Sequence, residues 1–257
     1  MKLVKIDSVS DTQTFTVESG ALRVTDPCYD MTTWCAGTLD KVRNGLWYTH
    51  VGYHKDAEEE AWALNSIKDM SERIAKKRAS VEGVLGEAAQ MVRIMADMEE
   101  RDMLKRKADH EAYLGRVAFI HIVQADTLTN QFNHEQPLPS SFELADIDVG
   151  VDSGQAGFFD LAKYTLSLAD KDDSRSRRES KDSVFEAFYD SVCNLTLDDK
   201  SFGTLQFGTV SSSGYGDGSY NCYARRDDFG TVVEAVIIFL EEYEDADETD
   251  EEGELAG

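Results

Sequence analysis

Three short segments of the chain combine aspartate with glycine or proline, which are residue types that can hold a cation or bring backbone N–H groups to a ligand. In the first segment Asp26 precedes a proline, in the second Asp152 precedes Ser-Gly, and in the third Asp217 lies between two glycines. If the three carboxylates converge, their oxygens would suit Mg²⁺ or Ca²⁺. One hypothesis is therefore a metal-dependent hydrolase that acts on a phosphorylated small molecule.

Each segment also has a structural interpretation. An aspartate at a strand end before a proline often accepts backbone N–H bonds and caps the turn, which would account for Asp26. Asp160 stands where a helix over residues 161–168 would begin, so its side chain would cap that helix. The glycines beside Asp152 could bring N–H groups near an anion, but the segment lacks the lysine of a P-loop and does not fit the dinucleotide fingerprint. For the segment from Asp152 to Asp160, an anion-binding loop and a helix cap both stay open.

The alternative to metal binding is a pocket for a small ligand or a partner protein, formed by polar and aromatic side chains of these segments. Glycine permits irregular backbone and close approach by another group. The candidate ligand-binding residues are Asp26, Tyr29, Asp152, Ser153, Gln155, Asp160, Tyr215, Asp217 and Tyr220.

The sequence offers little support for nucleophilic or zinc-dependent catalysis. It contains no Gly-x-Ser-x-Gly, and none of its five histidines lies in a metal-binding spacing such as His-Glu-x-x-His. His50 and His54 are four residues apart, but they fall on a predicted strand, where four residues span about 13 Å. We therefore assign no catalytic residue and favour binding over enzymatic activity.

Alternating apolar and β-branched residues predict a β-rich body. Asn44-Gly45 is a strong hairpin signal and leads into an aromatic strand at residues 46–53. Further strands are predicted at 14–17, 21–25, 117–123, 142–151, 205–210, 220–224 and 231–240, with short helices at 158–168 and 183–193. The expected fold class is α+β with a largely antiparallel sheet, and the body would comprise residues 1–54 and 114–240.

The segment between the two parts of the body, residues 55–113, predicts a helical arm. It has no proline from residue 56 to 112, and apolar residues recur every seven positions: Ile67, Ile74, Val81, Ala88 and Met95, with Met70, Val84, Met91 and Met98 at the second apolar position. Two antiparallel helices over about 57–81 and 87–111 are favoured over one long rod, because strands flank the arm on both sides and Gly83 and Gly86 weaken a helix interior. Residues 57–111 could pack on themselves, form a homo-oligomer or dock a partner.

The chain is strongly acidic, with a formal net charge of −24, and the charge is uneven. Residues 241–257 contain ten acidic residues and no basic one, which predicts a disordered acidic tail. This composition argues against binding to the DNA backbone, which needs basic patches. A tail that clamps a basic protein, or one that mimics nucleic acid, is a further alternative.

The compartment we expect is the cytoplasm. No stretch has the roughly 20 apolar residues of a membrane span, and the first residues show no apolar signal-peptide core. The four cysteines lack paired spacing, which is typical of reduced thiols.

The order of the motifs resembles an uncharacterised family of bacterial and phage proteins classed only as a domain of unknown function. The matching motifs are S-G-x-L leading to D-P (residues 19–27), an N-G turn before an aromatic strand (44–47), V-D-x-G followed by F-x-D (151–160) and G-x-G-D-G-x-Y (214–220). The resemblance covers roughly residues 15–53, 114–160 and 200–240, and leaves the arm and the tail outside. It supplies no reaction or ligand, but it implies one β-rich domain with the arm inserted, and it suits a bacterial or phage origin.

Together these features predict a cytoplasmic binding or interaction protein. Its Asp/Gly-rich loops would bind a small ligand or a host protein, and no resident cofactor is predicted beyond the possible Mg²⁺ or Ca²⁺. The metal-dependent hydrolase and the acidic nucleic-acid mimic are the alternatives.

Overall fold

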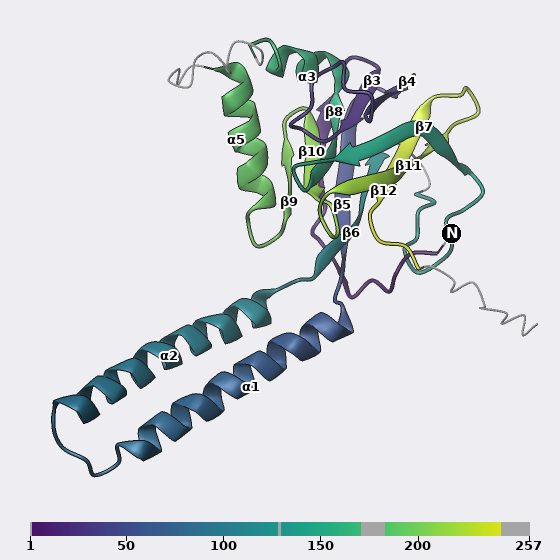
Figure 1. The fold of residues 1–257 in the computed structure, drawn as a ribbon. Helices are drawn as coiled ribbons and strands as arrows, with labels where there is room; N and C mark the ends of the chain where they lie inside the picture. Colours follow the sequence, from purple (N-terminus) through teal and green to yellow (C-terminus); the bar gives the residue numbers. More distant parts are fainter. Residues whose placement is uncertain (1, 128–129, 171–182, 243–257) are drawn as a thin grey trace, which may run out of the picture.

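Twelve strands form two antiparallel sheets in the computed structural model, which describes residues 2–127, 130–170 and 183–242 (Figure 1). The larger sheet contains β1 (Ser8–Val9), β2 (Gln13–Val17), β5 (Gly45–His54), β6 (Arg116–Gln124), β7 (Phe142–Val151), β11 (Gly218–Arg226) and β12 (Val232–Ile238). Its strand order is β1-β5-β6-β12-β11-β7, and β2 also pairs with β5. The smaller sheet contains β3 (Ala21–Thr25), β4 (Gly37–Asp40), β8 (Gln155–Asp160), β9 (Phe202–Leu205) and β10 (Gly208–Ser212), in the order β4-β3-β8-β10-β9. The predicted antiparallel α+β class is confirmed.

The two sheets pack face to face, and a helical layer covers the other face of the smaller sheet. Successive residues of a strand point to opposite faces, so Phe158 lies in the core between the sheets while Phe159 packs against α3 (Leu161–Ser167) and α5 (Val184–Thr196). The helix predicted over 158–168 therefore begins three residues later than expected. The apolar residues before it belong to β8, whose two faces are both buried.

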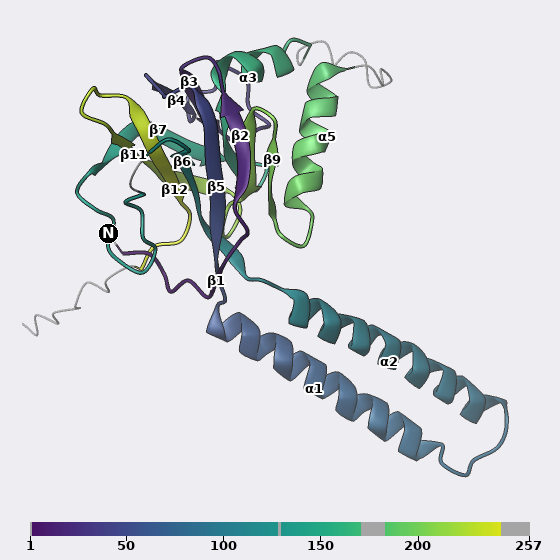
Figure 2. The ribbon, with the colours of Figure 1, turned by 180° about the vertical axis from the view of Figure 1, so that it is seen from behind.

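The arm consists of α1 (Ala57–Ser80) and α2 (Glu87–Ala112), which run side by side away from the body (Figures 1 and 2). The chain leaves the body at the end of β5 and returns at the start of β6, and these strands are neighbours, with His54 opposite Arg116. Gly115 lies at this root with φ of 116°, and a Cβ there would lie 2.5 Å from the carbonyl oxygen of His54. The return of the arm to its starting point therefore requires glycine at this position.

The two arm helices do not share one continuous heptad seam. In α1 the predicted positions Met70 and Ile74 are buried, but α2 buries Ala89 and Ala96 instead of the predicted Ala88 and Met95. Small alanine side chains let the two helices approach, and the ion pairs Lys77–Glu99, Arg78–Asp97 and Arg78–Glu100 join them at the surface. The apolar heptad residues of α2 are left on its outer side.

Among the described residues, no helix combines the length and the apolar character needed to cross a membrane. The predicted acidic tail lies outside the described residues, apart from Glu241 and Glu242.

Candidate functional site

Two of the three Asp/Gly motifs lie where the chain crosses from one sheet to the other, and the Asp26 motif follows β3 within the smaller sheet. Residues 152–154 connect β7 of the larger sheet to β8 of the smaller one, and residues 213–217 connect β10 of the smaller sheet to β11 of the larger one. The two connections lie side by side, because the N–H of Ser213 donates to the carbonyl oxygen of Gly154 at 3.0 Å. The motifs are thus neighbours in space, although about 60 residues separate these two in the sequence.

Asp26 joins the first motif to the second through a network of hydrogen bonds. Its carboxylate is fully buried and accepts bonds from the backbone N–H of Cys28 (2.8 Å), Asp152 (2.9 Å) and Ser153 (2.8 Å) and from the Ser153 hydroxyl (2.7 Å). Both oxygens therefore face donors of the protein itself. This arrangement matches the structural interpretation of Asp26 and leaves no open face for a ligand.

Tyr29, Ser153 and Asp152 surround this network. The Tyr29 hydroxyl contacts Cys35 and the Asp152 side chain, and burial, followed by these two contacts, raises the pKa of the phenol. Gln155 donates from its Nε2 to the sulfur of Cys193 at 3.6 Å. These predicted residues do come together, but they form the packed junction between the sheets.

Asp160 lies elsewhere and caps α3. It accepts from the backbone N–H of Lys163 at 3.1 Å, and it also accepts from the N–H groups of Glu18 (2.7 Å) and Ser19 (2.8 Å) in the β2–β3 turn. Burial acts to raise the pKa of this carboxyl, but the three N–H groups outweigh burial and hold the pKa below its usual range. Asp160 is therefore a helix cap and a turn anchor.

The predicted meeting of Asp26, Asp152 and Asp217 on a cation finds no support in the geometry. Within the described ranges, no group of three or more His, Cys, Asp or Glu side chains is placed to hold a metal ion. Asp217 is exposed in the turn before β11, and Asp26 is occupied by donors.

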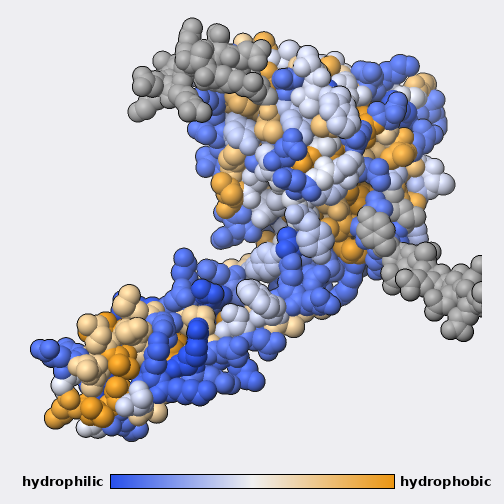
Figure 3. Space-filling model, in the orientation of Figure 1, coloured by the Kyte–Doolittle hydropathy of each residue, from blue (hydrophilic) through white to orange (hydrophobic). Residues whose placement is uncertain are grey.

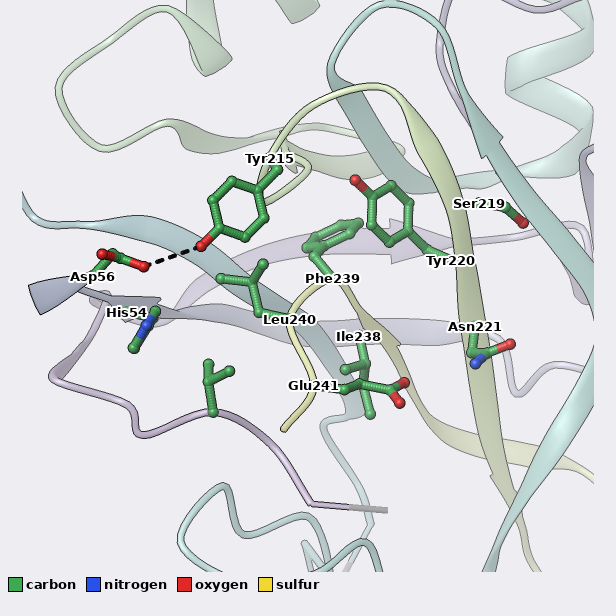
Figure 4. A pocket seen from close by; sticks show the side chains of 11 residues that line it. His54, Asp56, Tyr215, Ser219, Tyr220, Asn221, Ile238, Phe239, Leu240 and Glu241 are labelled. Carbon is green, nitrogen blue, oxygen red and sulfur yellow. Dashed lines mark hydrogen bonds between the residues drawn. The ribbon is translucent and has the colours of Figure 1, made fainter. Parts of the chain in front are cut away.

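A pocket opens where β12 separates from β11 (Figure 4). The ladder between these strands ends at the pair Asn221–Ile238, after which the N–H groups of Phe239 and Leu240 both turn to the carbonyl oxygen of Ala118 in β6. The first residues of β11, Gly218–Tyr220, continue beside β7 only. A cavity of about 530 Å³ lies in this fork, lined by Val4, His54, Asp56, Tyr215, Ser219, Tyr220, Asn221, Ile238, Phe239, Leu240 and Glu241. We refer to it as the arm-root pocket.

The base of the arm forms one wall of the arm-root pocket. Asp56 caps α1 through one carboxylate oxygen, which accepts from the N–H of Glu58 and Glu59, and its other oxygen accepts from the Tyr215 hydroxyl at 3.3 Å. The Arg116 guanidinium lies 4.5 Å from the centre of the Tyr215 ring and forms an ion pair with Glu59. The loop that carries Tyr215 is therefore fastened to the place where the arm joins the body.

Tyr220 forms the opposite wall of the pocket and also binds the backbone of the loop that precedes it. Its hydroxyl lies 2.7 Å from the carbonyl oxygen of Gly216 and 3.0 Å from that of Ser213. Its ring packs edge-on against Phe239 at 5.1 Å between centroids. Gly216 adopts a φ of 105°, a conformation that favours glycine, so the glycine-rich spacing serves this closed loop.

The charge of the pocket is negative. Backbone N–H groups of Glu59 and Glu58 outweigh burial and hold the pKa of Asp56 below its usual range, so this carboxyl is ionised at neutral pH. Burial is the main cause that raises the pKa of the Tyr215 phenol, and the neighbouring Asp56 is the second. The phenol therefore stays neutral. Glu241 adds a second carboxyl to the lining, and its side chain meets no hydrogen-bond donor among the residues that the structure describes.

Sequence reasoning found two residues of this pocket, Tyr215 and Tyr220, and missed the rest. Asp56 carried a usable signal, since it directly precedes a helix whose first turn is acidic and so reads as an N-cap. No sequence pattern marked the other lining residues, such as His54, Asn221 and the residues after Ile238. Their role depends on the point where β12 leaves β11.

Comparison with known proteins gives one match. A model of the family described as "Protein of unknown function (DUF4241)" matches residues 15–237. No curated protein and no solved structure matches the chain.

Proposed function

We propose that this chain, which belongs to the DUF4241 family of proteins of unknown function, is a binding protein whose arm-root pocket accepts a cationic group. The observation that carries the proposal is the pocket itself, a cavity of about 530 Å³ with aromatic walls and two carboxyl groups at its edge. A cavity of this size falls within the range of small-molecule sites.

The electrostatics favour an amine or a guanidinium over a phosphate. Asp56 and Glu241 line the cavity, while the nearby Arg116 is already paired with Glu59. Tyr215 and Tyr220 place aromatic rings in the lining, and an aromatic ring attracts cations because its face carries negative charge density, as the Arg116 guanidinium over the Tyr215 ring illustrates. The net charge of −24 further attracts cations to the molecule. The same charges disfavour the phosphorylated substrate of the hydrolase hypothesis.

Two sources of such a group fit the pocket: a lysine or arginine side chain of a partner protein, and a free amine. The fork between β11 and β12 presents main-chain groups beside the cavity, which suits a short extended peptide that carries the cation. The predicted cytoplasmic location and the bacterial or phage origin belong to this proposal, with a host protein as the partner.

Titration of the full-length protein with cationic and anionic probes tests the proposal. L-arginine amide represents the peptide side chain, spermidine the free amine and inorganic phosphate the anion. Binding is followed by chemical-shift changes of Tyr215, Tyr220 and Glu241 in NMR spectra. We expect the two cations, and not phosphate, to shift these signals.

A matched pair of charge variants supplies the control. Glu241→Gln removes a carboxyl of the pocket, and Asp217→Asn removes an exposed carboxyl of the same loop region that does not line it. We expect about threefold to tenfold weaker cation binding for Glu241→Gln, since a partly exposed ion pair contributes about 1 kcal/mol, and little change for Asp217→Asn. Equal effects of both variants, or stronger binding of phosphate than of either cation, would contradict the proposal.

A further inference from the structure

The outer side of α2 and the turn that precedes it carry exposed apolar residues. Figure 3 shows hydrophobic residues gathered at the tip of the arm, away from the charged middle. These residues are Val84, Leu85, Met91, Ile94, Met95 and Met98, of which Leu85 is 92% exposed and Met98 is 61% exposed. We refer to these six residues as the tip stripe.

The four tip-stripe residues that belong to α2, Met91, Ile94, Met95 and Met98, lie on the side of the helix that faces away from α1. Ala89 and Ala96 are buried against α1. Met91 and Met98 each follow one of these alanines by two positions, which is a rotation of about 200° around a helix with 3.6 residues per turn. α2 is therefore apolar on two opposite sides, and the residues that the structure describes cover only one of them.

The spacing of the tip stripe is that of a coiled-coil seam. Within α2, Met91 and Met98 are seven residues apart, and Ile94 and Met95 fill the intervening turn. This is the α2 half of the heptad pattern, and the arm hairpin leaves it unused. A heptad seam that meets no partner helix among residues 2–127, 130–170 and 183–242 points to a helix of a second molecule.

The exposed area fits a specific contact between two copies. At about 100 Å² of apolar area for a fully exposed aliphatic side chain, the tip stripe exposes roughly 350 Å² in one copy. A contiguous apolar patch of this size is comparable to the largest patch on a typical protein surface, and such patches often serve an interaction. Two such stripes bury about 700 Å², and the polar residues beside them bring the total close to the roughly 1,000 Å² of a specific interface.

The charges around the tip stripe select an antiparallel arrangement. Glu87 and Arg101 lie on the same side of α2 as the stripe, seven residues before and seven residues after Ile94. A twofold axis at Ile94 places Glu87 of each copy opposite Arg101 of the other, and it brings Met91 of each copy within one residue of the position opposite Met98. A parallel arrangement would instead place like charges together.

From these observations we propose that the tip stripe is the interface of a homodimer, in which α2 packs antiparallel against α2 of a second copy. Each arm then lies along the other, and the two bodies lie at opposite ends. The arrangement is isologous, since the same surface serves in both copies.

Sedimentation velocity of the full-length protein between 1 and 200 µM (about the range in which weak dimers dissociate) tests the dimer. We expect the double variant Met91→Glu/Met98→Glu to be monomeric throughout, with unchanged helix content by circular dichroism. Leu166→Glu replaces a residue of α3 that is 65% exposed, outside the arm, and should dimerise like the unaltered chain.

A charge exchange tests the antiparallel direction. Glu87→Arg alone should weaken the dimer about threefold to tenfold, and Glu87→Arg/Arg101→Glu should restore it. A chain that is monomeric at every concentration would overturn the proposal and point to a different partner for the stripe. A dimer that survives Met91→Glu/Met98→Glu would place the interface elsewhere, and failure of the charge exchange to restore the dimer would overturn its direction.

Discussion

Removing the Asp26 carboxylate should destabilise the protein without affecting any ligand chemistry, because this side chain connects two parts of the fold. Asp26→Ala leaves the N–H groups of Cys28, Asp152 and Ser153 without their acceptor and opens a polar gap at a fully buried position. Each hydrogen bond to a charged acceptor contributes about 1.5–3 kcal/mol. The three bonds are not additive, and water can reach the partly exposed turn, so we expect a loss of about 3–5 kcal/mol.

A graded series of variants separates this effect from a general response to mutation. Ser153→Ala removes the hydroxyl donor and keeps the backbone bonds, so it should cost about 1 kcal/mol. Asp26→Asn keeps the shape and one acceptor oxygen but presents an amide N–H to backbone donors, so it should cost about 2–3 kcal/mol. Asp217→Asn changes an exposed carboxyl and should stay within about 0.5 kcal/mol of the unaltered chain.

The assay is urea unfolding at pH 7, followed by circular dichroism and by tryptophan fluorescence. Thermal unfolding gives a second measure of the same loss. In a domain of this size each kcal/mol lowers the melting temperature by about 2–4 °C, so the melting temperature of Asp26→Ala should be roughly 10 °C lower. If Asp26→Ala and Asp217→Asn are equally stable, Asp26 does not hold the two loops together, and the reasoning is refuted. A ligand or metal role for Asp26 would instead give a variant that is stable and loses binding.

Three further predictions concern the buried His50 of β5, the arm root and the arm. Burial is the main cause that lowers the pKa of His50 to about 3, and the neighbouring His121 and His134 lower it further. Because this pKa lies below the unfolded value of about 6.5, the contribution of His50 to the free energy of unfolding is complete above pH 6.5 and falls with the pH. At pH 5 the loss is about 2 kcal/mol. Urea unfolding at pH 7 and pH 5 should therefore show a smaller loss for His50→Gln than for the unaltered chain, and equal losses would contradict this. Gly115→Ala forces a Cβ to within 2.5 Å of the carbonyl oxygen of His54 at a positive φ and should cost more than about 2 kcal/mol, whereas Gly83→Ala, with open space around it, should cost about 1 kcal/mol. Ala96→Leu overpacks the fully buried contact between the arm helices and should cost about 1–3 kcal/mol, with Ala88→Leu on the exposed side as its neutral control, both read from the loss of helical signal in urea.

The sequence alone determined the local elements and their class. Alternating apolar residues, the Asn44-Gly45 turn and the proline-free segment after residue 55 identified strands and helices, because these patterns reflect the short-range geometry of the backbone. Local patterns also predicted that Asp26 caps a turn and that Asp160 caps a helix, and the hydrogen bonds of both carboxylates agree with these interpretations. The expectation of an uncharacterised family agrees with the match of residues 15–237 to a family of unknown function.

Only the tertiary structure decided which motifs form a pocket and which form a junction. Asp26, Asp152 and Tyr215 look alike in the sequence, as polar residues in glycine-rich segments. Their roles separate because the buried Asp26 carboxylate accepts a hydrogen bond from the backbone N–H of Asp152, whose side chain is exposed, whereas the departure of β12 from β11 opens a cavity beside Tyr215. That departure depends on pairing among strands that lie more than 100 residues apart, and no local pattern encodes it.

The arm shows the same division. Periodicity predicted helices, yet it could not show which apolar side of α2 would face α1, since a methionine face and an alanine face are both compatible with a helix. Ala89 and Ala96 are the residues of α2 that pack against α1, and their small side chains allow the two helices to lie close together. The methionines were thereby left outside, at the surface where we place the second copy.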